Sequence, residues 1–154
     1  MREEKPNDTP VMEHYNQVFL AGSIEMGKAE DWQSRVVAEF ASDDVTFYNP
    51  RRDDWDSSWT QDQSNLQFNK QVNWELNRLN TADIIFFYFS PGTISPISLL
   101  ELGLYIDSNP IVCCPPGFQR KGNIDIVCTR KGISVYNNLE DAIGALRTRI
   151  TSNY

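Results

Sequence analysis

Cysteine, histidine and long apolar runs are scarce in this sequence of 154 residues. The three cysteines are Cys113, Cys114 and Cys128, whose spacing matches neither a disulfide framework nor a zinc site. His14 is the single histidine, which excludes a cluster of histidine ligands and a Ser-His-Asp triad. No segment approaches the roughly 18 apolar residues of a membrane span, and the polar first segment lacks the apolar core of a secretion signal. We therefore expect a cytoplasmic protein with no bound metal and no membrane contact.

Basic residues are also in deficit, with 14 Lys and Arg against 21 Asp and Glu and a net charge of −7. Because nucleic-acid affinity comes largely from basic side chains that neutralise phosphates, this balance argues against binding of duplex nucleic acid. A small anion such as the phosphate of one nucleotide stays possible, since a few local groups can bind it. The sequence has neither a Walker A nor a GxGxxG motif, so P-loop hydrolysis and dinucleotide binding are unsupported, and we expect no cofactor.

The composition and the pattern of apolar residues predict one α/β domain. Apolar residues make up 40% and charged residues 23%, as in ordinary globular proteins. We expect a flexible lead-in over residues 1–15 and a single domain over residues 16–154. Strands are predicted at residues 17–21, 45–48, 83–89, 111–114 and 133–136. Helices are predicted near residues 30–40, 68–79, 95–108, 124–130 and 139–150. This alternation is typical of a doubly wound parallel sheet, here of about five strands.

Ligands of such sheets bind at the carboxyl ends of the strands, where this sequence places three polar segments, 22–25, 49–55 and 90–95. In the first segment, Gly22 permits a close backbone approach to a ligand and Ser23 offers a hydroxyl. An ordinary strand-to-helix turn would use the same two residues. Both interpretations stay open for this segment.

The second segment supplies four further candidates for substrate binding, Asn49, Arg51, Asp54 and Trp55. Its arginines could bind a polar ligand, or they could form a solvated ion-pair cluster with the neighbouring aspartates. Trp55 could stack on a base, or it could anchor the loop through apolar packing.

Glu101 is the most informative residue of the third helix. Ser95 and Pro96 predict the start of this helix, with Ser95 as its cap and Pro96 at its first position. Glu101 then lies in the second turn, and Ile97 and Leu104 are expected on the same face. Carboxylates are rarely buried without a purpose or a partner. Burial would raise the pKa of Glu101, whereas the helix N-terminus and hydroxyl donors would lower it, so both a nucleophile and a packed glutamate are possible.

Together these segments resemble the nucleoside 2-deoxyribosyltransferase-like family. The resembling segments are Phe19–Glu25, Trp32, Asn49–Trp55, Ala82–Ile85 and Leu100–Gly103, and they cover roughly residues 17–137. The resemblance implies a flavodoxin-like fold, a small-molecule nucleoside or nucleotide as substrate, and a homo-oligomer with shared active sites. It also implies a retaining mechanism, in which Glu101 attacks the anomeric carbon of a 2′-deoxynucleoside or its 5′-monophosphate and forms a covalent deoxyribosyl-enzyme.

The resemblance assigns roles to three further positions. Glu75 falls where the transferases place an aspartate that handles the base and its proton, although its helical spacing equally permits a packed glutamate. Ser95 replaces an aspartate near the sugar and resembles the serine of related deoxynucleoside 5′-monophosphate N-glycosidases, in which hydroxyls and helix amides receive phosphate. Asn123 lies near where the family lends a polar residue from a neighbouring subunit to the 5′ end of the sugar.

Three functions stay open at this point. The first is cleavage or transfer at the N-glycosidic bond of deoxynucleosides or deoxynucleotides, where hydrolase and transferase differ only in the acceptor. The second is a non-catalytic protein that binds or sequesters a nucleotide in the same pocket. The third is an N-glycosidase for a ribosylated nucleotide, because nothing in the sequence distinguishes ribose from deoxyribose.

Overall fold

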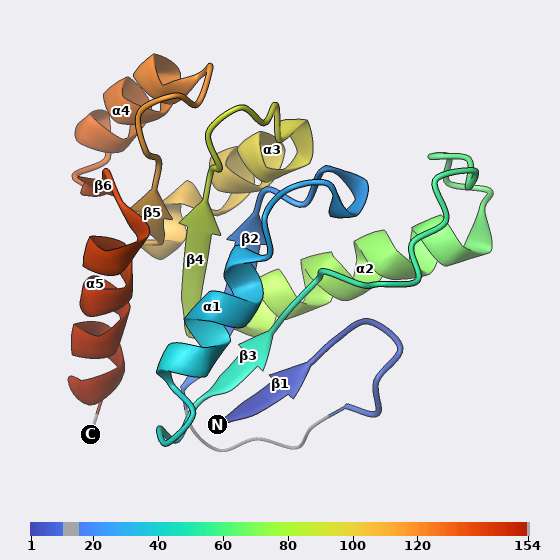
Figure 1. The fold of residues 1–154 in the computed structure, drawn as a ribbon, viewed down its shortest axis with the longest axis horizontal. Coiled ribbons are helices and arrows are strands. Elements are labelled where there is room, and N and C mark those ends of the chain that lie inside the picture. Colours follow the sequence, from blue (N-terminus) through green and yellow to red (C-terminus); the bar gives the residue numbers. More distant parts are fainter. Residues whose placement is uncertain (11–15, 154) are drawn as a thin grey trace.

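A parallel sheet of six strands forms the centre of the protein, whose computed structural model describes residues 1–10 and 16–153 (Figure 1). The strands are β1 (Arg2–Glu4), β2 (Gln17–Gly22), β3 (Thr46–Tyr48), β4 (Ile84–Tyr88), β5 (Ile111–Cys113) and β6 (Val135–Tyr136). The α-helices are α1 (Trp32–Glu39), α2 (Leu66–Thr81), α3 (Pro96–Tyr105), α4 (Lys121–Arg130) and α5 (Leu139–Thr151), and two 3-10 turns are η1 (Glu25–Gly27) and η2 (Ile106–Ser108). Every strand pair is parallel, which confirms the predicted α/β class.

The strand order across the sheet is β1-β3-β2-β4-β5-β6. From β2 the chain passes through α1 to β3 on one side, and from β4 it passes through α3 to β5 on the other side. The five strands β3 to β6 in this order have the doubly wound arrangement of flavodoxin-like sheets, and β1 adds a sixth strand at one edge. The direction of winding changes between β2 and β4. The carboxyl ends of these two strands therefore form the crevice in which such folds bind ligands.

Two apolar layers cover the sheet. Helices α1 and α5 pack on one face, and α2, α3 and α4 pack on the other (Figure 1). The central strand β4 shows how the sequence fills both layers, because Ile84, Phe86 and Tyr88 face the first layer while Ile85 and Phe87 face the second. A strand that is buried on both faces needs a continuous apolar run, which is the pattern that residues 83–89 show.

Residues 2–4, within the lead-in that was expected to be flexible, form strand β1. Residues 2–4 pair with residues 46–48 of β3, and Glu4 is buried. Arg78 of α2 forms an ion pair with Glu4 at 2.6 Å, and the indole of Trp74 donates to the same carboxylate at 3.2 Å. The sequence did not predict this edge strand, because its charged residues are typical of an exposed segment. Glu4 is buried only because partners about 70 residues away in the chain pack against it. Residues 11–15 of the lead-in, with His14, lie outside the described residues.

Side-chain caps fix the starts of three helices. Asp31, Asn65 and Asn138 each accept a hydrogen bond from the amide three residues further on, at the N-termini of α1, α2 and α5. Within the described ranges, none of the helices has both the length and the hydropathy that a membrane span requires.

Candidate active site

Gly22, at the end of β2, sets the shape of the crevice. Its φ is +148°, and a Cβ at this position would lie 2.2 Å from the carbonyl oxygen of Tyr88 and 2.9 Å from the ring of Trp32. Only glycine lets β2 approach β4 so closely. The indole of Trp32 then donates to the carbonyl of Ser23 at 2.9 Å. Gly22 therefore serves the contact between two strands, and its expected contact with a ligand stays a prediction.

Three hydroxyl groups, those of Ser23, Thr93 and Ser95, meet at the carboxyl ends of β2 and β4 and are called the hydroxyl cluster below. The Ser23 oxygen lies 2.9 Å from that of Thr93 and 2.6 Å from that of Ser95, and the Thr93 and Ser95 oxygens are 2.9 Å apart. The amide of Ser90 donates to Ser23 Oγ at 2.9 Å, and Thr93 Oγ1 donates to the Ser90 carbonyl at 2.8 Å. The structure thus brings the first and third polar segments together.

Glu25, and not Ser95, caps the N-terminus of α3. Ser95 has a φ of 46° and makes no side-chain capping bond, because its hydroxyl points into the hydroxyl cluster. Glu25 Oε1 instead accepts hydrogen bonds from the amides of Ser95 at 2.8 Å and Ile94 at 3.2 Å. The prediction of Ser95 as a side-chain cap is therefore wrong. Its amide is also occupied by a carboxylate, rather than open to a phosphate.

Glu101 faces the interior of the protein from the second turn of α3. Its exposed fraction is 8%, and Ser98 and Leu102 are the other buried residues of this helix. Ile97 and Leu104 are 59% and 60% exposed, so the prediction that they share the surroundings of Glu101 is wrong. Helix α3 is apolar on both its inner and its outer side. The apolar pattern alone therefore could not indicate which side faces the sheet.

Glu75 of α2 and Glu101 of α3 form a pair of interacting carboxyl groups, called the acid pair below. Burial raises the pKa of Glu101 well above its usual range, and the negative charge of Glu75 adds to this rise. Burial also raises the pKa of Glu75, and a hydrogen bond from Gln71 opposes the rise. Two carboxyls that interact in this way titrate as a unit and share one proton over a range of pH. One ionised and one protonated acid are what retaining glycosyl chemistry requires.

A chain of hydrogen bonds connects the acid pair to the loop over residues 49–65. Gln71 Nε2 donates to Glu75 Oε1 at 2.7 Å, and Arg52 Nη1 donates to Gln71 Oε1 at 3.4 Å. Arg52 also pairs with Asp54 at 2.7 Å and stacks over the ring of Trp59 at 5.1 Å. Asp54, predicted to bind substrate, is therefore exposed and engaged with Arg52. Asp54 is connected to the acid pair through Arg52 and Gln71.

Trp55 and Trp59 pack against each other within this loop. Their rings meet edge to face with centroids 5.2 Å apart. The indole nitrogen of Trp55 is buried and has no hydrogen-bond partner among the described residues. Of the two interpretations of Trp55, the structure favours packing within the loop, and it leaves one indole donor unused.

Asn49 and Arg51 hold protein segments together. The buried side chain of Asn49 donates to Glu3 at 2.7 Å and accepts from the amide of Arg51 at 3.0 Å. The guanidinium of Arg51 donates to three backbone carbonyls of residues 27–30 at distances from 2.6 to 3.1 Å. These bonds hold protein segments together, and the expected role of both residues in substrate binding stays a prediction.

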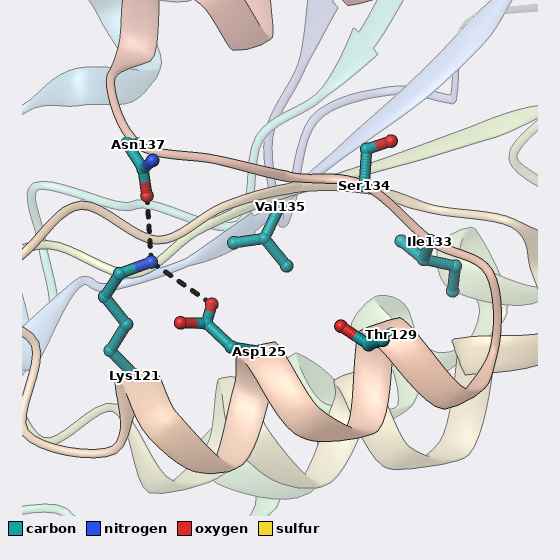
Figure 2. A pocket seen from close by; sticks show the side chains of 7 residues that line it. All are labelled: Lys121, Asp125, Thr129, Ile133, Ser134, Val135 and Asn137. Atoms are coloured by element: carbon teal, nitrogen blue, oxygen red, sulfur yellow. Dashed lines mark hydrogen bonds and ion pairs between the residues drawn. The ribbon is translucent and has the colours of Figure 1, made fainter.

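Asn123 is exposed in the first turn of α4, and no described hydrogen bond joins it to the acid pair. A hollow of about 320 Å³ lies between α4 and the segment around β6 (Figure 2). Lys121 spans this hollow, since its ammonium donates to Asp125 at 3.1 Å and to Asn137 at 2.9 Å. The hollow contains none of the predicted site residues and its charged groups are already paired, so it is separate from the candidate site.

Neither the cysteines nor the acidic residues offer a metal centre in the part of the chain that the structure describes. Cys113, Cys114 and Cys128 are buried and free. Burial raises the pKa of Cys113 to about 12 and that of Cys114 to about 11. Such thiols are poor nucleophiles and poor metal ligands near neutral pH.

Three residues of the site, Glu25, Gln71 and Thr93, were missed by the sequence analysis. Glu25 and Thr93 lie inside polar segments that were noted, but their contacts join segments about 70 residues apart in the chain. Gln71 did carry a signal, because it precedes Glu75 by four residues on the same helix. This spacing predicts that its amide can reach the carboxylate.

Comparisons with known proteins identify a family and a fold. The family model described as "Nucleoside 2-deoxyribosyltransferase like" matches residues 15–118, a span that includes both members of the acid pair. No curated protein matches the chain. The fold is similar to that of a solved structure from Enterococcus faecalis V583, described as a conserved protein, with a TM-score of 0.59 and 12% identity over 88% of this chain and 99% of that chain. At this identity the likeness shows the fold alone.

Proposed function

Because the chain belongs to the nucleoside 2-deoxyribosyltransferase-like family, we propose that it cleaves or exchanges the N-glycosidic bond of 2′-deoxynucleosides or their 5′-monophosphates. The observation that carries this proposal is the acid pair. Glu101 is buried, its pKa is raised by burial and by Glu75, and both carboxyls come from the helices that cover one face of the sheet. Buried carboxylates are costly, and a raised pKa in a crevice is typical of catalytic acids.

In the proposed reaction, a carboxylate oxygen of Glu101 attacks C1′ of the deoxyribose. The bond from C1′ to the base nitrogen breaks, its electron pair passes to the base, and the protonated carboxyl of Glu75 supplies the proton to the base. The product of this first step is a covalent deoxyribosyl ester of Glu101. A second base or a water molecule then attacks C1′ from the opposite side, while Glu75 accepts the proton and Glu101 leaves.

The substrate itself would set which member of the acid pair is ionised. Positive charge develops at C1′ in the transition state of glycosyl transfer. This charge stabilises the ionised form of the neighbouring Glu101, so the shared proton stays with Glu75. Gln71 donates to Oε1 of Glu75, so the proton would sit on Oε2, and the same bond opposes the rise in the pKa of Glu75.

A panel of deoxynucleosides and their 5′-monophosphates, incubated with and without a free acceptor base and separated by chromatography, tests the proposal. We expect free or exchanged base from the wild-type protein. Glu101→Gln should lower the rate by at least about 1,000-fold, because it removes the nucleophile. Mass spectrometry of the quenched wild-type protein should show the deoxyribosyl adduct on the peptide that contains Glu101. The matched control is Glu39→Gln, which removes an exposed carboxylate at the end of α1 and should leave the rate unchanged.

The proposal also includes a homo-oligomer in which a second copy covers the outer side of α3. Ile97, Leu100 and Leu104 form an apolar stripe on that side and are 59% to 60% exposed. Contiguous apolar surface of this kind marks an interaction site. Light scattering after gel filtration should show an oligomer that Leu100→Glu dissociates with loss of activity. A fully active monomer would contradict this part of the proposal.

A further inference from the structure

Glu25 occupies the end of α3 that lies nearest to the hydroxyl cluster. Among the described residues, its Oε1 accepts both amide bonds, from Ile94 and Ser95, so Oε2 keeps its lone pairs for a ligand. Glu25 adopts a φ of 50°, which is uncommon for a residue with a side chain. A carboxylate at a helix N-terminus is stabilised by the helix dipole. A carboxylate therefore lies beside the hydroxyl cluster at the start of α3.

The hydroxyl cluster has more hydrogen-bond contacts than it has hydrogens. Four oxygen pairs lie within hydrogen-bond distance, three of them inside the cluster and one between Thr93 and the carbonyl of Ser90. Each hydroxyl carries one hydrogen, so Ser23, Thr93 and Ser95 supply three for these four contacts. The amide of Ser90 donates to Ser23, but its hydrogen does not lie between any of these four oxygen pairs. One contact is always left without a hydrogen, and the cluster can accept one more from outside.

These two observations favour a ligand group that donates a hydrogen. A sugar hydroxyl brings its own hydrogen, which it can donate to a cluster oxygen or to Oε2 of Glu25. A phosphate monoester at neutral pH carries a charge of about −1.5 to −2 and adds only acceptors. It would compete with Glu25 for the amides of Ile94 and Ser95 and would find no spare hydroxyl hydrogen in the cluster.

Helix geometry places the hydroxyl cluster at a suitable distance from the reacting carbon. Ser95 precedes Glu101 by six residues on the same helix, which corresponds to about 9 Å along the axis. We propose that a sugar which presents C1′ to Glu101 and its base to Glu75 extends its 5′ end toward the start of α3. In this proposal Glu25 is a specificity-determining residue, which selects deoxynucleosides with a free 5′-hydroxyl and rejects their 5′-monophosphates. This inference rests on the proposed function and narrows its substrate class.

The test compares kcat/KM for one deoxynucleoside and for its 5′-monophosphate in the wild-type protein and in Glu25→Gln. We expect the wild type to prefer the nucleoside by at least about tenfold, since like charges brought together at a binding site are strongly unfavourable. Glu25→Gln removes the charge and adds two donors, so it should lower this preference by about tenfold or more. Glu39→Gln removes the same charge at a distant exposed position and should leave the preference unchanged. The ratio of the two substrates does not depend on how much of a variant is folded.

The outcomes separate the inference from the proposed function. A wild type that cleaves both compounds but prefers the monophosphate, or a Glu25→Gln variant with an unchanged preference, would overturn the role of Glu25 and leave the proposed function intact. If neither compound is cleaved, the proposed function fails. In that case, calorimetry measures the affinities of the two compounds. The ratio of these affinities in the wild type, compared with the ratio in Glu25→Gln, then tests the role of Glu25.

Discussion

Replacement of Glu75 by glutamine tests whether the two buried carboxyls act as one unit. The change removes the negative charge beside Glu101 and the acid that would protonate the departing base, and it preserves the size of the side chain. Burial is the larger cause that raises the pKa of Glu101 from 4.5 to about 8, and the charge of Glu75 is the second cause. At about 1.4 kcal/mol per pKa unit, the whole rise disfavours ionised Glu101 by about 5 kcal/mol.

In the wild type, kcat/KM should be bell-shaped in pH, because one carboxyl must be ionised and the other protonated. In Glu75→Gln, we expect the falling limb to disappear, because no second carboxyl remains to ionise. Activity toward bases that leave only when protonated should fall by about 100-fold to 10,000-fold, the usual contribution of a general acid. A synthetic deoxyriboside whose leaving group departs without a proton should lose far less. The measurement is the full pH profile of kcat/KM for both substrates.

Glu75→Asp provides the control for this prediction. It keeps an acid at the position and should retain both limbs of the profile with reduced activity. If Glu75→Gln instead keeps the falling limb and loses the same factor on both leaving groups, Glu75 is not the acid and the shared proton of the acid pair is refuted.

The structure makes three further predictions. Gly22→Ala should destabilise the fold by about 3 kcal/mol in chemical denaturation, because its Cβ would lie 2.2 Å from a β4 carbonyl oxygen; Gly103→Ala, where a Cβ meets nothing within 4 Å, is the control that should not destabilise. Arg78→Ala should cost about 3 kcal/mol and expose β1 to hydrogen exchange, because it removes the ion-pair partner of the buried Glu4; unchanged protection of residues 2–4 would contradict this. Glu101→Gln should stabilise the protein at high pH, because the raised pKa of Glu101 gives stability that is present in full below pH 4.5 and lost as pH rises through about 8. The gap between this variant and the wild type should therefore close as pH falls, and a constant gap would contradict the assigned titration.

The central part of the fold was predictable from the sequence because its signals are local. Residues 83–89 are a continuous apolar run, and β4 is buried on both faces within them. The helices over 66–81 and 139–151 follow from spacing within each segment. Strand β1 gave no such signal, because it has three charged or polar residues and becomes a strand only through β3 and Arg78.

The site was predictable only in part for the same reason. The resemblance identified Glu75 and Glu101, but the coupling between them depends on how α2 and α3 pack, which no local pattern contains. The alternation of apolar residues placed Glu101 correctly in the second turn of α3 and gave it the wrong neighbours, since both sides of this helix are apolar. Capping chemistry predicted Ser95 as the cap from the nearest residues, whereas the carboxylate that does cap α3 comes from η1, 70 residues earlier.

The position of β1 at the edge has a consequence for the order in which the chain assembles. Residues 2–4 leave the ribosome before residues 46–48, with which they pair, and before Arg78, which neutralises Glu4. Their final contacts need both β3 and Arg78, so they are completed only after the chain has been synthesised through α2. Contacts between segments so distant in sequence form slowly. During synthesis, the open edge of β3 is thus a temporary template for pairing with other chains, which β1 covers when it docks.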